Sequence, residues 1–200
     1  MTAHSSQPHT SVLPPVLEPG DIILTQGNSW LSRMIRRFER APGEGPALVN
    51  HAGICVCSPD IIVEALEHVE RHSYITKYVG SGHKMMVFRP RDLNPVDQRI
   101  LIHAAEHYIG DSYGWWKLLG HLGDAWLSSK VGREIYLLRR LFFLDRYPIC
   151  SYLVAQAESR IGRDFGVPAN EADPDDIYDY CVGHPEKYEL VFELQEIRRD

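Results

Sequence analysis

The chain has 200 residues, of which 44% are hydrophobic and 24% charged, and it carries a formal net charge of −6. These proportions are typical of a globular protein that is long enough to bury a core. The acidic balance provides no basic surface for nucleic acid, which is therefore excluded as an expected partner. Four scattered cysteines are too few to predict a disulfide-stabilised scaffold.

The first 18 residues are rich in Ser, Thr, Pro and His and lack the basic and apolar stretches of a signal peptide. We therefore expect a disordered tail over residues 1–18, followed by a single domain over residues 19–200. Nowhere do roughly 18 apolar residues follow one another, so no transmembrane helix is predicted. The expectation is a soluble, cytoplasmic protein.

Apolar periodicity and Gly/Pro punctuation predict the elements of this domain in chain order. Strands are expected at 21–25, 51–57, 61–67, 84–89 and 188–194, and helices at 30–38, 95–109 and 150–161. Residues 115–147 are expected as a helical insertion, and Asp173-Pro174 should begin a short helix. The pattern predicts an α+β fold, with helices packed on a small antiparallel sheet curved into a partial barrel.

The thiol of Cys150 is the first candidate functional group. Pro148 and Ile149 lead into a run of strong helix formers, which places Cys150 at the first turn of the predicted helix 150–161. Free N–H groups and the helix dipole favour an anion there. Such a thiol has a lowered pKa and is a candidate nucleophile. The alternative is a small, buried apolar residue.

A base and an orienting carboxylate occur about a hundred residues earlier in the chain. His51 opens strand 51–57 among small residues, and Glu64 lies in an apolar strand where an unpaired carboxylate is costly to bury. A hairpin centred just before Ser58 would place His51 directly opposite Glu64 on the same face. The carboxylate would then fix the imidazole tautomer for a thiol nucleophile. The alternatives are a hydrogen-bonded core histidine and a solvent-facing glutamate.

Five short motifs follow one another in an informative order. They are Gly20-Asp21-Ile22-Ile23, His51-Ala52-Gly53-Ile54, Val63-Glu64-Ala65, Phe88-Arg89-Pro90 and Cys150-Ser151-x-Leu153-Val154. Over roughly residues 19–160, this order resembles the bacterial YiiX-like family of permuted papain-fold cysteine hydrolases. These are relatives of NlpC-type endopeptidases and of lecithin:retinol acyltransferase-like enzymes.

The resemblance implies a circularly permuted papain-like (NlpC-type) fold and hydrolysis through an acyl-enzyme. Cys150 would be the nucleophile, His51 the general base and acid, and Glu64 the residue that orients His51. No metal or cofactor is expected.

Three further residues are candidates for substrate binding. Gly110-Asp111-Ser112-Tyr113 resembles the family's Gly-x-x-Tyr segment, which points to Tyr113. Asn50 and Tyr152 stand where the family more often has serine and glutamate.

The expected substrate is a small molecule, a peptide or a lipid-acyl compound, because amide, ester and thioester carbonyls all suit this chemistry. The segment 115–147 is rich in aromatics and leucine, with Lys and Arg interspersed. It could hold acyl chains or rest on a membrane surface. The alternative is a helical hairpin packed on the core. The sequence leaves the oligomeric state open.

Two other functions compete with the hydrolase hypothesis. The first is a non-catalytic ligand-binding module on the same scaffold. The second is a zinc peptidase, because His103, Glu106 and His107 match the H-x-x-E-H pattern. A helical wheel places these three opposite the apolar side of their helix, which favours a solvated face. His68 and His72, also four residues apart, are expected to be solvated residues after a strand.

Overall fold

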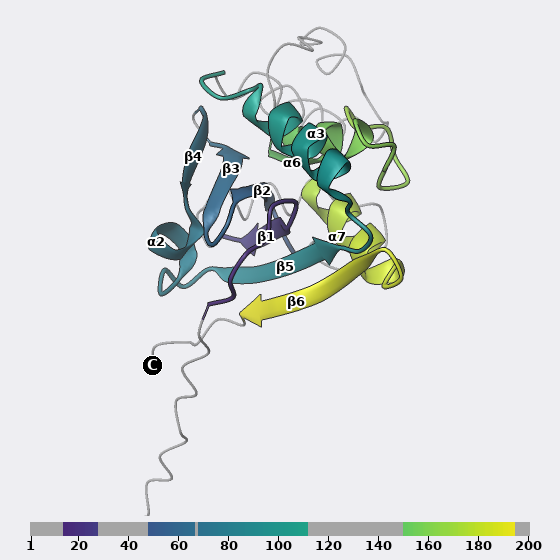
Figure 1. Cartoon of the computed structure of the whole chain (residues 1–200). Coiled ribbons are helices and arrows are strands. Elements are labelled where there is room, and N and C mark those ends of the chain that lie inside the picture. The colour runs from purple at the N-terminus through teal and green to yellow at the C-terminus, as the bar shows by residue number, and fades with distance from the viewer. Residues whose placement is uncertain (1–13, 28–47, 67, 112–149, 195–200) are drawn as a thin grey trace, which may run out of the picture.

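A six-stranded antiparallel sheet forms the centre of the protein (Figure 1). The computed structural model describes residues 14–27, 48–66, 68–111 and 150–194. The strands are β1 (Ile22–Gln26), β2 (His51–Cys57), β3 (Ile61–Ala65), β4 (Val69–Ser73), β5 (Lys84–Pro90) and β6 (Tyr188–Leu194). They pair in the order β4-β3-β2-β1-β5-β6, and every pair is antiparallel. The predicted α+β class is confirmed.

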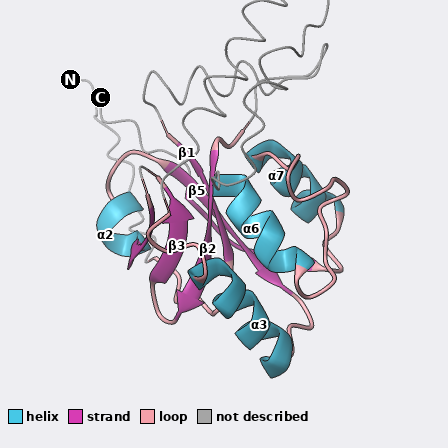
Figure 2. Cartoon of the chain, turned by 90° about the horizontal axis from the view of Figure 1, so that it is seen from above, coloured by secondary structure: helices cyan, strands magenta, loops and turns pink. Residues whose placement is uncertain are grey.

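Helices cover both faces of this sheet (Figure 2). On one face lie α3 (Pro95–Glu106), α6 (Cys150–Ser159) and α7 (Pro174–Gly183), and on the other lies the short α2 (Tyr74–Tyr78). The burial of both faces explains the continuous apolar run in β1. Ile22 and Leu24 pack towards the three helices, whereas Ile23 packs towards α2.

Local capping explains where two of the helices begin. The side chain of Asn94 accepts hydrogen bonds from the N–H groups of Val96 and Asp97, ahead of α3. Asp173 and Asp176 form a reciprocal capping box at the start of α7. Both caps satisfy N–H groups that have no partner within the helix. The predicted helix after Asp173 is confirmed.

Part of the segment expected as a tail lies against the sheet. Leu17 is fully buried, and its N–H donates to the carbonyl of Pro59. Arg89 of β5 reaches back to the carboxylates of Glu18 and Asp21, which fastens the entry to β1. Residues 14–18 thus contribute to the fold.

Two elements of the structure are absent from the sequence-based expectation. These are β4 and α2, which follow β3 directly and lead into β5. The predicted helix 30–38 and the insertion 115–147 lie outside the described residues. In the described part of the chain, no helix is both long and apolar enough to span a bilayer.

Candidate active site

The register of the β2–β3 hairpin determines how His51 and Glu64 meet. The predicted register is wrong: Glu64 pairs with Gly53, two residues further along β2. A β-bulge between Cys55 and Cys57 shifts the register between β2 and β3 just before the turn that joins these strands. Because side chains alternate along a strand with a period of two, a two-residue offset keeps His51 and Glu64 on the same face.

The two side chains meet diagonally across the hairpin. Nε2 of His51 lies 2.6 Å from Oε2 of Glu64. The absence of a side chain at Gly53 leaves the space beside Glu64 open, since a Cβ there would lie 3.5 Å from Oε2. The carboxylate engages Nε2, so Nδ1 is the ring nitrogen left for another partner.

Glu64 is the centre of a cluster of donors on the α2 face of the sheet. Its carboxylate is 1% exposed. Oε2 also accepts a 2.6 Å hydrogen bond from the hydroxyl of Tyr78. Oε1 contacts the ammonium of Lys77, and it lies 2.5 Å from Nε2 of His72. Four side chains from β2, β4 and α2 thus surround one buried carboxylate, as its charge requires.

These contacts determine which groups in the cluster are charged. Burial alone would raise the pKa of Glu64, but the charge of His51 and the donors around the carboxylate hold that pKa well below its usual range. Burial alone would lower the pKa of His51. The charges of Glu64 and Cys150 outweigh it and raise the pKa to about 10. At neutral pH the pair is therefore a carboxylate and an imidazolium.

Cys150 begins α6 and completes the site from the other face of the sheet. Its side chain is 5% exposed and belongs to the core between α6 and β2. The His51 ring and the N–H groups of Ala52 and Ser151 are the groups that stabilise the charge of the sulfur. Burial opposes ionisation, but the positive charge of His51 and these N–H groups lower the pKa of the thiol. The arrangement favours a thiolate–imidazolium pair.

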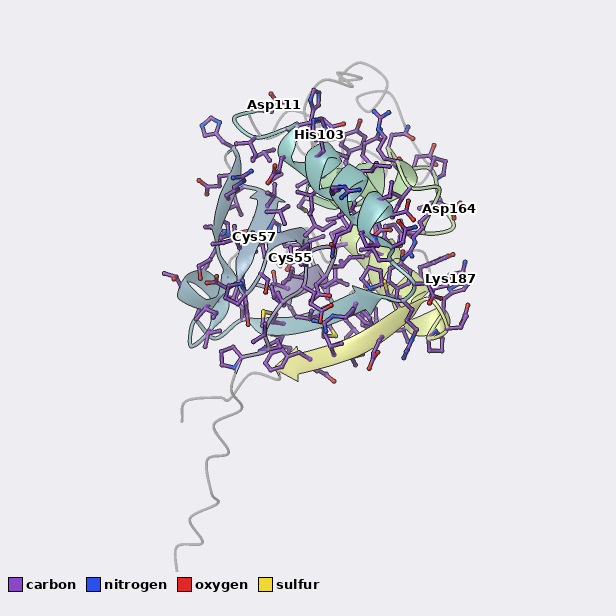
Figure 3. All side chains as sticks on the ribbon, viewed as in Figure 1. Cys55, Cys57, His103, Asp111, Asp164 and Lys187 are labelled. Carbon is purple, nitrogen blue, oxygen red and sulfur yellow. The ribbon has the colours of Figure 1, made fainter. Side chains whose placement is uncertain are left out.

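The other cysteines occupy different environments. Burial raises the pKa of Cys55 to about 12 and also raises the pKa of Cys181 above its usual value. Cys57 is exposed on β2, two residues from Cys55 (Figure 3). Among the described residues, Cys150 is therefore the buried cysteine whose pKa is lowered.

The candidate substrate-binding residues have other contacts. The side-chain oxygen of Asn50 is buried and accepts from the N–H of Gly27 at 2.9 Å, so it anchors the end of β1. Tyr152 lies roughly 200° around α6 from Cys150. Its ring packs edge-on against Tyr108, with 6.0 Å between the ring centres. Tyr113 lies outside the described residues.

Three members of the site were missed by sequence reasoning. His72 lies in β4 and turns its Nε2 towards Glu64, whereas the sequence predicted a solvated side chain. Lys77 and Tyr78 end the short helix α2, which the sequence did not predict. The sequence signal that could have indicated these residues was Glu64 itself, because a carboxylate buried in an apolar strand needs hydrogen-bond donors from neighbouring elements.

The side chains of the zinc-peptidase motif do not converge. His103 of α3 and His107, which caps that helix, are both exposed, and Figure 3 marks His103. Glu106 forms an ion pair with Arg71 of β4. Among the described residues, no three His, Cys, Asp or Glu side chains are grouped so that they could hold a metal ion. The geometry thus disfavours the zinc-peptidase alternative.

No protein-family model matches this chain, and no curated protein matches it. The functional assignment therefore rests on the geometry and electrostatics of the Cys150–His51–Glu64 site.

Replacing Gly53 by alanine tests the space that lets Glu64 reach His51. The new Cβ would lie 3.2 Å from Cβ of Glu64, which must shift by a few tenths of an ångström. We expect the G53A variant to lower the alkylation rate of Cys150 by about threefold to tenfold, since small misplacements of catalytic groups are costly. The free energy of unfolding should change by only about 1 kcal/mol.

Gly183→Ala is the matched control, because a Cβ at Gly183 meets no atom within 4 Å. Alkylation rates of the two variants, with urea unfolding of each, provide the comparison. Equal rates would show that the open space at Gly53 is not needed by the site.

Proposed function

We propose that the protein is a cysteine hydrolase that forms an acyl-enzyme on Cys150, on a permuted papain-like scaffold. The main support is the 2.6 Å contact of His51 with Glu64, together with the mutual stabilisation of charge between the His51 ring and the Cys150 sulfur. A thiol with a lowered pKa, a cationic imidazole and a buried carboxylate are the three groups that such chemistry requires.

In the acylation step, the Cys150 thiolate attacks the carbonyl carbon of an amide, ester or thioester. A C–S bond forms and the carbonyl becomes a tetrahedral oxyanion. The N–H of Cys150 at the start of α6 is the proposed donor to this oxyanion. Nδ1–H of the His51 imidazolium then protonates the leaving group as its bond to the acyl carbon breaks. The products are an acyl-enzyme and a neutral His51.

In the deacylation step, neutral His51 takes a proton from water as the water oxygen attacks the thioester. The C–S bond breaks, the acid product leaves, and the thiolate–imidazolium pair is restored. Glu64 bonds Nε2 throughout, so it keeps Nδ1 directed at the reacting atoms and stabilises the imidazolium. Its other donors, Lys77 and Tyr78, hold the carboxylate in place.

Trapping of the acyl-enzyme tests the proposal and identifies the class of substrate. The intact protein is incubated with a peptide amide, a phospholipid and an acyl thioester, and its mass is then measured. We expect one member of the panel to add one acyl group, which peptide mapping assigns to Cys150. Cys150→Ala should abolish the adduct. Cys57→Ser should leave it unchanged, because Cys57 is an exposed thiol outside the site.

An adduct that maps to Cys57 would contradict the proposal. The absence of any adduct across the panel would favour the alternative of a non-catalytic ligand-binding module.

A further inference from the structure

A groove between α3 and α6 is separate from the proposed active site. It has a volume of about 500 Å³, and its lining includes Arg99, Ile100, His103, His107, Tyr108 and Arg160. We call it the α3–α6 groove. Arg160 follows Cys150 by ten residues, which is about 15 Å along a helix. A ligand in the groove would therefore not occupy the site at the thiol.

Among the described residues, two cations of the groove have no acidic partner. In the described part of the chain, neither Arg99 nor Arg160 forms an ion pair, whereas Arg71, Arg89 and Arg91 each do. No Asp or Glu is among the described residues that line the groove, and Glu106 of α3 pairs with Arg71. This local excess of positive charge contrasts with the net charge of −6 of the whole chain.

The lining also carries imidazole donors and an apolar surface. His103 and His107 lie four and eight residues after Arg99, so all three project from one side of α3. Arg160 faces them from the end of α6. Ile100 and Tyr108 add apolar surface between these polar groups. Guanidinium groups and imidazole N–H groups beside apolar surface suit an amphipathic anion.

We propose that the α3–α6 groove binds an organic phosphate ester with a short apolar chain. Two guanidinium groups match the charge and the several oxygens of a phosphate monoester better than a single carboxylate. The apolar chain would lie on Ile100 and Tyr108. The phosphate can belong to a free ester or to a lipid headgroup, because the same side chains recognise either.

Titration with hexyl phosphate, followed by the imidazole NMR signals of His103 and His107, tests the proposal. We expect saturable shifts in the wild type, and binding weakened at least about tenfold when Arg99→Gln and Arg160→Gln are combined. The matched control combines Arg91→Gln with Lys187→Gln, which removes two cations that line a different pocket. The control should bind like the wild type. Hexanoate should bind more weakly, and hexanol should not bind.

Co-sedimentation with vesicles of phosphatidylcholine and phosphatidic acid, whose headgroup is a phosphate monoester, distinguishes a lipid source from a free ester. Sedimentation that depends on Arg99 and Arg160, without hexyl phosphate binding, would place the phosphate in a lipid headgroup. The proposal is overturned if neither probe binds, or if the Arg99/Arg160 double variant binds both probes as well as the wild type.

Discussion

Iodoacetamide at about pH 6.5 is expected to alkylate Cys150 while Cys55 and Cys181 remain unmodified. The reagent attacks the thiolate, and His51 holds Cys150 in that form by lowering its pKa. Cys55, with a pKa of about 12, and Cys181, whose pKa is also raised, are neutral at this pH. Peptide mapping measures each rate separately, and a Cys57→Ser background removes the exposed thiol.

Replacing His51 by alanine should remove this reactivity. Without the imidazolium, burial of Cys150 is opposed only by the N–H groups of Ala52 and Ser151, so the pKa of the thiol should rise. An ordinary thiol is about 1% ionised at pH 6.5, so we expect the alkylation rate to fall by roughly a hundredfold. Cys150 that reacts equally fast in the H51A variant would show that the thiolate does not depend on His51.

The sign of the pH dependence follows from the two pKa shifts. The thiolate persists down to the lowered pKa of Cys150, and alkylation slows as the pH falls through it. Above about pH 10, His51 loses its proton while the thiolate remains. Alkylation should therefore continue there. Hydrolysis should decline, because neutral His51 cannot protonate the leaving group.

Glu64→Gln is the second change with a large expected effect. The amide keeps the shape of the side chain but removes the charge that His51, His72 and Lys77 share. We expect acyl-enzyme turnover to fall on the order of 10²–10⁴-fold, the range for a charge lost behind a catalytic histidine. Loss of one partner from a buried ion pair costs about 3–5 kcal/mol. The lower end applies here, since Lys77 is 31% exposed and can turn towards water.

The pH dependence of unfolding distinguishes a charge effect from a packing effect in this variant. The pKa of Glu64 is lower in the folded state, so its contribution is present above its unfolded pKa and is lost as the pH falls through its folded pKa. As the pH falls, the free energy of unfolding should therefore decrease less steeply in E64Q than in the wild type. If the free energy of unfolding fell equally with decreasing pH in both proteins, the assignment of a negative charge to Glu64 would be contradicted.

Glu158→Gln is the matched control for this test. Glu158 is also fully buried, but burial raises its pKa to about 7. Its ionisation therefore destabilises the folded state as the pH rises from its unfolded pKa towards about 7. E158Q should keep the reactivity of Cys150 and should be more stable than the wild type at about pH 8.

Most of the described elements could be predicted from the sequence, because their signals are local. The turn at Ser58-Pro59-Asp60, the cap at Asp173 and the apolar run of β1 each act over a few residues. The contacts of His51 with Glu64 and Cys150 were also anticipated, from motif order and from the need to pair a buried carboxylate.

The remaining features depend on contacts that a local pattern does not contain. The strand β4 reads Val-Glu-Arg-His-Ser, which has no alternation of apolar and polar residues, yet pairing with β3 makes it a strand. The bulge between Cys55 and Cys57 has no glycine or proline to mark it. His72 and Lys77 became recognisable as partners of Glu64 only once β4 and α2 had been placed beside β3.

The outermost strands of the described sheet have a consequence for self-association. β4 exposes Glu70 and Arg71 to solvent, and β6 exposes Glu189 and Glu193. If the β6 edges of two copies came together, the charged side chains of Glu193 and of Glu189, which pairs with Arg91, would be crowded at one seam, and the loss of their hydration would oppose strand addition. Natural sheets use such charges to prevent the growth of fibrils from an open edge. These charges on β6 would therefore oppose growth of the described sheet through that edge.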